Sequence, residues 1–109
     1  MTDPMPSPAG VHPRHGVDEA LTAPLRLSIV AALSRVDNAE FATIRDSLEV
    51  SDSLLSKQAT VLEAAGYIAV RKGYVGKRPR TWLSVTTAGR AALASHLAAL
   101  RAIVDGLEP

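Results

Sequence analysis

The sequence predicts one small, mainly α-helical domain that carries a single β-hairpin. Apolar residues recur at a helical spacing in four separate segments of the chain. Two further segments alternate apolar and polar residues, and they flank a stretch that contains Gly and Pro. The chain has 109 residues, of which 47% are hydrophobic, which is enough for one core of modest size.

The first helical segment covers residues 18–36. Pro24 is tolerated only in the first turn of a helix, so the main helix is expected to begin near Ala23, after a short preceding turn. Asp37 and Asn38 are expected to end it. The positions expected to face inward are Leu25, Ile29, Ala32, Leu33 and Val36.

Residues 40–48 and 51–65 are expected to form the second and third helices, joined by a tight connection. Ser51 is a suitable N-cap because its hydroxyl can accept a hydrogen bond from a free amide of the first turn. Gly66 stands where the chain leaves the third helix and a left-handed conformation is needed. The expected inward residues are Phe41, Ile44, Leu48, Leu55, Ala59 and Leu62.

Two short strands are expected over Tyr67–Lys72 and Thr81–Val85, with a connecting loop over residues 73–80. Gly and Pro in that loop favour a hairpin turn. Thr86 is expected to cap a last helix, residues 87–105. The strand residues expected to face inward are Ile68, Val70, Leu83 and Val85.

The order of these elements predicts a specific architecture. Two short helices with a tight connection form a helix-turn-helix, and a β-hairpin directly after it is a wing. Residues 18–105 are therefore predicted to be one winged helix-turn-helix domain. Residues 1–17 contain four Pro and two Gly without an apolar period, so we expect a flexible tail there.

Charge is unevenly distributed along the chain. The net charge is only +1, yet residues 1–52 hold four basic and eight acidic side chains, and residues 53–104 hold eight basic and one acidic. Five of the ten residues in RKGYVGKRPR (71–80) are Lys or Arg. Such an asymmetry points to an anionic partner for the basic half, although a charged run can also be a solvated loop.

The third helix and the wing together indicate a double-stranded DNA partner. A helix fits the major groove, where its first turns reach base edges. Cations on an adjacent loop suit phosphates or the minor groove. The candidate DNA-binding residues are Ser51, Ser53, Leu54, Ser56, Lys57 and Thr60 on the third helix and Arg71, Lys72, Lys77, Arg78 and Arg80 on the wing.

Three side chains in this region have two interpretations each. Leu54 either contacts a thymine methyl or packs against the second helix. Trp82 either covers a partner subunit or packs on the stems of the wing. Gln58 either reads an adenine or is turned away by its position on the helix.

The last helix carries an apolar stripe that either closes the core or pairs with the same helix of a second chain. We favour a homodimer, because two-fold symmetry presents two recognition helices to two half-sites. The residues of this candidate interface are Leu93, Leu97, Leu100 and Val104.

Several functions are disfavoured by the composition. The absence of Cys excludes disulfides and thiolate metal sites, and a cytoplasmic setting is expected. Neither a secretory signal nor an apolar run of membrane-spanning length is expected. Because no catalytic motif or His cluster occurs, we expect neither an enzyme nor a cofactor nor a metal site.

Three segments resemble the winged-helix transcriptional regulators. They are APLRLSIVAAL (23–33), FATIRDSLEVSDSLLSKQATVLEAAGYIAV (41–70) and GKRPRTWLSVTTAGRAAL (76–93). The chain is similar to the MarR and ArsR families, and most similar to their small winged helix DNA-binding domain relatives. The resemblance implies a homodimeric, sequence-specific binder of double-stranded DNA, usually a repressor.

The chain also departs from these relatives. Its recognition helix has fewer cations, with Lys57 alone, and ArsR-type metal sensing through Cys pairs does not carry over. A small-molecule effector is compatible with the resemblance, but no residue identifies one. The alternative function is a winged-helix protein-interaction module without a DNA target. Binding of RNA or of single strands is a minor alternative, because only four residues are aromatic.

Overall fold

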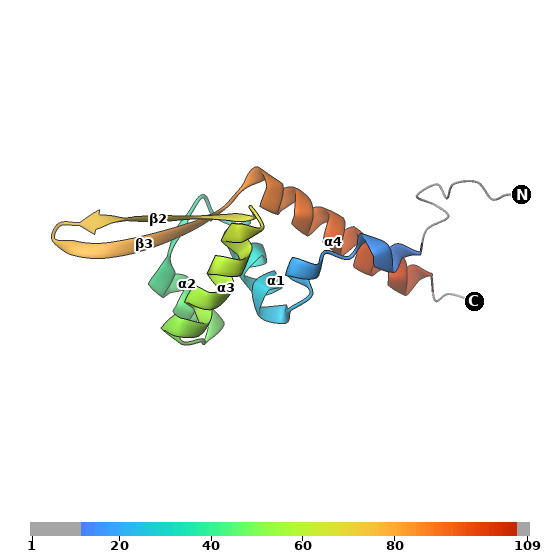
Figure 1. The fold of residues 1–109 in the computed structure, drawn as a ribbon, viewed down its shortest axis with the longest axis horizontal. Coiled ribbons are helices and arrows are strands. Elements are labelled where there is room, and N and C mark those ends of the chain that lie inside the picture. Colours follow the sequence, from blue (N-terminus) through green and yellow to red (C-terminus); the bar gives the residue numbers. More distant parts are fainter. Residues whose placement is uncertain (1–11, 107–109) are drawn as a thin grey trace, which may run out of the picture.

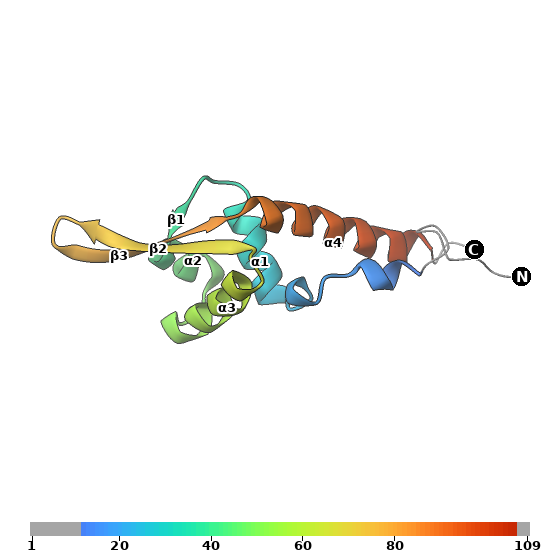
Figure 2. The same cartoon turned by 45° about the horizontal axis from the view of Figure 1, so that its top comes forward.

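The structure, a computed structural model that describes residues 12–106, is mainly helical with one small antiparallel sheet. The predicted fold class is confirmed. Helices α1, α2 and α3 form a compact group, and the hairpin and α4 extend from it in opposite directions (Figure 1, Figure 2). The elements are η2 (Pro13–Gly16), η3 (Glu19–Leu21), α1 (Pro24–Leu33), β1 (Ala39–Glu40), α2 (Phe41–Leu48), α3 (Asp52–Ala64), β2 (Ile68–Val75), β3 (Arg78–Val85) and α4 (Thr87–Asp105).

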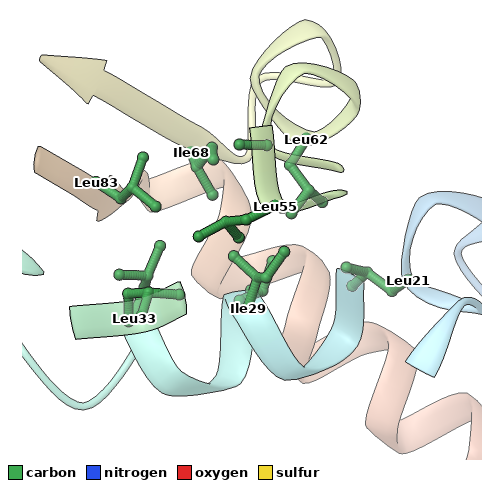
Figure 3. Close-up of a cluster of buried hydrophobic side chains, with 10 residues drawn as sticks. Leu21, Ile29, Leu33, Leu55, Leu62, Ile68 and Leu83 are labelled. Atoms are coloured by element: carbon green, nitrogen blue, oxygen red, sulfur yellow. The ribbon is translucent and has the colours of Figure 1, made fainter. Parts of the chain in front are cut away.

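One hydrophobic core joins the helices to the base of the hairpin. Leucine and isoleucine side chains from η3, α1, α3, β2 and β3 point toward one another there (Figure 3). Its fully or almost fully buried members are Leu21, Ile29, Val30, Leu33, Ile44, Leu55, Ala59, Leu62, Ile68 and Leu83. The predicted inward positions Leu25, Ala32, Phe41, Leu48, Val70 and Val85 are partly buried and pack against this cluster. The periodicity therefore located the core on all of these elements.

The predicted helix boundaries are set by the expected local interactions. The Ser51 hydroxyl accepts a hydrogen bond from the Leu54 amide at 3.1 Å, and Thr86 accepts one from the Gly89 amide at 2.9 Å. Gly66 has a φ of 82°, so it ends α3 in the left-handed conformation that glycine adopts without strain. Pro24 occupies the first turn of α1, as expected.

α4 is attached to the helical core by its first turn. A Cβ on Gly89 would lie 2.1 Å from the Tyr67 carbonyl oxygen, so only glycine lets the two backbones approach this closely. The Arg90 guanidinium donates a hydrogen bond to the Ser34 carbonyl at 2.8 Å, beyond the last turn of α1. These contacts give a physical reason for the Gly-Arg pair that follows the wing.

Several details of the predicted elements differ in the structure. The first helix ends at Leu33 rather than at residue 36, so Val36 is 42% exposed instead of facing inward. Residues 39–40 form the short strand β1, which pairs with Leu83 and Trp82. The expected tail over residues 1–17 is ordered from Pro13 to Gly16, where η2 lies along α4 (Figure 1). The remainder of that tail, residues 1–11, lies outside the described residues.

The largest difference concerns the wing. We expected a loop over residues 73–80, but β2 and β3 pair along their whole lengths and leave only Gly76 and Lys77 in the turn. Gly76 has a φ of 64°, which is the conformation of a glycine at the first central position of a type II′ hairpin turn. Pro79 therefore lies within a strand, paired with Tyr74, and is not part of the turn.

Candidate nucleic-acid interface

α3 presents a polar face that points away from the core. Leu55, Ala59 and Leu62 are buried, and the residues between them are exposed except for the half-buried Gln58. Leu54 is 40% exposed, so packing does not cover it completely. The exposed candidates on or beside this helix are Ser51, Ser53, Leu54, Ser56, Lys57 and Thr60.

Gln58 is turned away from this face. Its side-chain oxygen accepts a hydrogen bond of 2.9 Å from Arg26 of α1. The same guanidinium donates to the Ala20 carbonyl at 2.7 Å. Gln58 therefore has a structural partner on α1.

The N-terminus of α3 is tied to α2 by an arginine that sequence reasoning missed. Arg45 donates to Asp46 at 2.9 Å and to Asp52, in the first turn of α3, at 2.8 Å. These hydrogen bonds raise the pKa of Arg45, and the bond from Arg45 lowers the pKa of Asp46. No local pattern marks Arg45, because its partner Asp52 lies on the next helix.

The pleat of the hairpin divides the five wing cations between two faces. Lys72 pairs with Thr81 on the face that carries Val70 and Leu83, which is the face toward α3. Arg71 and Arg78 lie on the opposite face, with Arg80. Lys77 is in the turn. The wing cations thus do not form the single patch that their clustering in the sequence suggested.

Two of these cations have partners within the chain. The Arg71 guanidinium lies over the Trp82 ring, 4.4 Å from its centroid. Arg80 forms an ion pair with Glu40 of β1 at 3.0 Å. Trp82 is partly buried and also abuts Gly73, so it packs on the stems of the wing, one of its two predicted positions.

Between α3 and the hairpin lies an open groove of about 420 Å³. Ser56 and Thr60 of α3 line one side, and Lys72 and Thr81 of the hairpin line the other. Both charge signs occur in it, since Asp52 and Glu63 also contribute to the lining. Of the candidate residues, the groove therefore brings Ser56, Thr60 and Lys72 together.

α4 leaves most of its apolar stripe uncovered. Leu93 packs against the core, whereas Leu97 is 48% exposed, Leu100 37% and Val104 64%. These three exposed residues line a shallow depression together with Arg101 and Asp105.

A buried polar cluster lies on the face of α4 next to this stripe. His96 is only 2% exposed, and its Nδ1 accepts a hydrogen bond of 3.0 Å from the Asp18 amide. The Asp18 carboxylate accepts hydrogen bonds from the Ala20 amide and from the Tyr67 hydroxyl. The bond to Asp18 raises the pKa of Tyr67. The cluster links α4 to the segment between α3 and β2.

Two kinds of site are absent from residues 12–106. None of the helices there combines the length and apolar character that a membrane crossing requires. Within this range, no group of three or more His, Cys, Asp or Glu side chains is placed to hold a metal ion.

Residues 25–104 match the model of a family described as "Winged helix DNA-binding domain". The chain belongs to this family. The match covers the helix-turn-helix, the wing and almost all of α4, so it includes every element of the candidate interface. The resemblance to winged-helix regulators is thereby confirmed.

Three known proteins are similar to this chain in sequence or in fold. A transcriptional regulator homologue from Pyrococcus horikoshii OT3 is 30% identical, with a TM-score of 0.76 over 84% of this chain and 91% of that one. The uncharacterized protein MJ0432 of Methanocaldococcus jannaschii is 26% identical over 73 residues, which are 67% of this chain and 79% of that protein. The M. tuberculosis transcriptional regulator MOSR, solved in complex with DNA, shares the fold. Its identity is 17% and its TM-score 0.65, over 87% of this chain and 68% of that one.

Proposed function

We propose that this winged-helix protein is a homodimeric transcriptional repressor that binds specific sequences of double-stranded DNA. The observation that carries the proposal is the shared surface of α3 and the hairpin. An exposed polar helix face and a protruding hairpin with cations lie on either side of one open groove.

In this proposal α3 lies in the major groove. Ser53, Ser56 and Lys57 occupy its first turns, the part of a recognition helix that reaches base edges. Ser51 donates to a phosphate, and Leu54 offers an apolar contact for a thymine methyl. Thr60 would donate to a phosphate after giving up its hydrogen bond of 3.0 Å to the Ser56 carbonyl. Lys57 is the only cation on α3, so bases are read here mainly by hydroxyl groups.

The wing, residues 73–80, lies on the backbone or in the minor groove. Lys77 and Arg78 have no ion-pair partner among residues 12–106, so both are free to meet phosphates. Lys72 faces α3 and likewise has no ion-pair partner among residues 12–106. Arg80 would exchange Glu40 for a phosphate, and Arg71 would contribute while stacked on Trp82.

α4 provides the dimer interface in this proposal. Its exposed residues Leu97, Leu100 and Val104 have no cover within the described chain, and Leu93 continues the stripe into the core. Arg101 and Asp105 border the stripe with opposite charges, which suits a self-complementary contact with a second copy around a two-fold axis.

No observation favours the protein-interaction module over DNA binding. That hypothesis needs an available Trp82, but this side chain is partly buried between Arg71 and Gly73. Only four residues of the chain are aromatic, which are too few to favour a stacking platform for single strands.

The test is fluorescence anisotropy with a duplex taken from immediately upstream of the protein's own coding sequence, compared with a scrambled duplex, at two salt concentrations. We expect preference for the upstream duplex and weaker binding at high salt. Arg78→Ala should weaken binding, whereas the control Arg14→Ala, which removes an exposed Arg from η2, should not. Equal binding of both duplexes, or none, contradicts a specific regulator of its own promoter.

A further inference from the structure

The N-terminal strap, residues 12–21, precedes the part of the chain that matches the family, residues 25–104. Its first part, η2, lies along α4 (Figure 1, Figure 2), and a Cβ on Gly16 would lie only 3.3 Å from the Cβ of Ala99. Its second part contains Asp18 and η3, and Leu21 at its end is fully buried in the core. The strap is therefore placed between α4 and the helical core.

Asp18 is the residue that attaches the strap on both sides. Its amide donates a hydrogen bond of 3.0 Å to Nδ1 of His96 in α4. Its carboxylate accepts from the Ala20 amide at 2.9 Å and also from the Tyr67 hydroxyl. The Tyr67 amide in turn donates to the Leu62 carbonyl at 3.0 Å, in the last turn of α3. One residue thus links α4 to the end of α3.

A second link joins the strap to the middle of α3. Arg26 of α1 donates to the Ala20 carbonyl at 2.7 Å and to the Gln58 side chain at 2.9 Å. Gln58 lies on α3, next to the exposed Lys57. A displacement of the strap would therefore withdraw hydrogen-bonded support from α3 at its middle and at its end.

The bond between Asp18 and His96 exists only while Nδ1 of His96 carries no proton. A ring nitrogen that accepts a hydrogen bond is unprotonated, whereas both nitrogens of an imidazolium are donors. Proton uptake would set two N–H groups against each other across the same 3.0 Å. Since His96 is only 2% exposed, solvent cannot stabilise the added charge unless the strap leaves α4.

The surroundings of His96 offer no acid that is ready to pair with an imidazolium. The Asp18 carboxylate is bonded to the Ala20 amide and the Tyr67 hydroxyl, so turning it toward His96 would break the link to α3 instead. One turn away on α4 the residues are uncharged, namely Ala92, Leu93, Ala99 and Leu100. Apart from the bonded Arg26, the charged or titratable side chains on the adjoining η2, η3 and strap segments are exposed, namely His12, Arg14, His15 and Glu19.

We propose that Asp18 is a positioning residue for α3 and that proton uptake by His96 releases it, so that DNA binding weakens as the pH falls. The coupling to DNA rests on the proposed function. The attachment is present at neutral pH, and an imidazole in water takes up a proton near pH 6.5. Because one proton per chain is involved, a fall from about pH 7.5 to pH 5.5 should lower the affinity by at most about tenfold for each bound chain.

Fluorescence anisotropy with the upstream duplex at pH 7.5 and pH 5.5, at one ionic strength, measures this effect. The reference protein is His12→Asn/His15→Asn, which leaves His96 as the only histidine of the three in the chain. Its affinity should fall severalfold at the lower pH. Adding His96→Asn keeps an acceptor for the Asp18 amide that does not titrate, so the affinity should stay at its pH 7.5 value. An equal fall in both proteins overturns the proposal.

Nuclear magnetic resonance of the reference protein without DNA tests the bond itself. We expect the His96 proton on Nε2 at pH 7.5, and we expect the Asp18 amide resonance to move with the same midpoint as the His96 ring. A proton on Nδ1 at pH 7.5, a ring that does not titrate in this interval, or an Asp18 amide that ignores the titration overturns the proposal. These resonances decide even if His96→Asn fails to fold, because they come from a chain that retains His96.

The two measurements also separate this proposal from the proposed function. A protein that binds no duplex at either pH overturns the proposed function and its coupling to pH. The resonances of Asp18 and His96 then still decide whether the strap is released by proton uptake. A protein that binds the duplex equally well at both pH values overturns the coupling alone.

Discussion

Replacing the exposed leucines and valine of α4 should convert the protein into a monomer. The triple substitution Leu97→Ala/Leu100→Ala/Val104→Ala removes apolar area but keeps good helix formers, so α4 itself should remain stable. Since Leu93 packs in the core, it is left in place.

The size of the effect follows from the exposed fractions. Leu97, Leu100 and Val104 are 48%, 37% and 64% exposed, so about half of each side chain remains to be buried by a partner. Full burial of such a side chain is worth about 1.5–3 kcal/mol, so half-burial contributes about 1 kcal/mol. Three positions on two copies give about 6 kcal/mol, which weakens the proposed dimer by roughly four orders of magnitude.

Sedimentation velocity over a dilution series measures this change directly. Val36→Ala is the control, because Val36 is 42% exposed but lies after α1, away from the stripe. The control should dimerise like the wild type. The interface reasoning is refuted if the triple variant has the wild-type dissociation constant, or if the wild type is itself a monomer at micromolar concentration.

Three further predictions concern stability and the wing. Gly89→Ala places a Cβ 2.1 Å from the Tyr67 carbonyl oxygen, and thermal melting should show a destabilisation of about 2 kcal/mol or more. Glu40→Gln frees Arg80 from its 3.0 Å ion pair, so anisotropy should show DNA affinity rising by about two- to fivefold. An unchanged affinity argues that Glu40 and DNA phosphate do not compete for Arg80. Tyr67 has a pKa raised above its ordinary 10.0 by its bond to Asp18, so that bond stabilises the fold fully below pH 10 and less as the pH rises through the raised pKa. Urea denaturation at pH 8 and pH 11 should show a smaller stability loss for Tyr67→Phe than for the wild type.

The sequence was sufficient for the helices, apart from the end of the first one, because their signals are local. Ser51 and Thr86 cap the helices that they were expected to cap, and the inward stripe of Leu55 and Leu62 recurs at a helical period. Each signal involves residues within one or two turns of one another. Tertiary packing did not have to be known in order to read them.

The ends of the strands could not be predicted in the same way. The outer half of the hairpin protrudes and is exposed on both faces, so its residues show no alternation of apolar and polar side chains. Backbone pairing continues there because the Gly76 turn fixes the register, and the stretch was interpreted as a loop for want of a hydrophobic signal. β1 was missed for a similar reason, since two residues cannot display a period.

The ion pairs and polar contacts around the interface were also invisible in the sequence. Arg45 meets Asp52 across a helix boundary, and Glu40 meets Arg80 across forty positions of chain. Asp18, Tyr67 and His96 lie in three separate segments of the chain. The Asp18 amide donates to His96, and the Asp18 carboxylate accepts from the Tyr67 hydroxyl. Only the fold brings such groups together, so a charged residue in the sequence does not reveal whether its charge is free.

The basic stretch at residues 71–80 thus contains two kinds of cation, those with a partner in the chain and those without one among the described residues. Arg71 and Arg80 lie toward the body of the domain, where one covers Trp82 and the other pairs with β1, so both help to hold the stem of the wing. Lys77 and Arg78 lie at the tip and are unpaired within the described chain. A firmly held stem places these cations at a fixed distance from α3. Less entropy is then lost when both elements bind one duplex, so Arg71 and Arg80 are expected to aid recognition by holding the stem as well as through any phosphate that they reach.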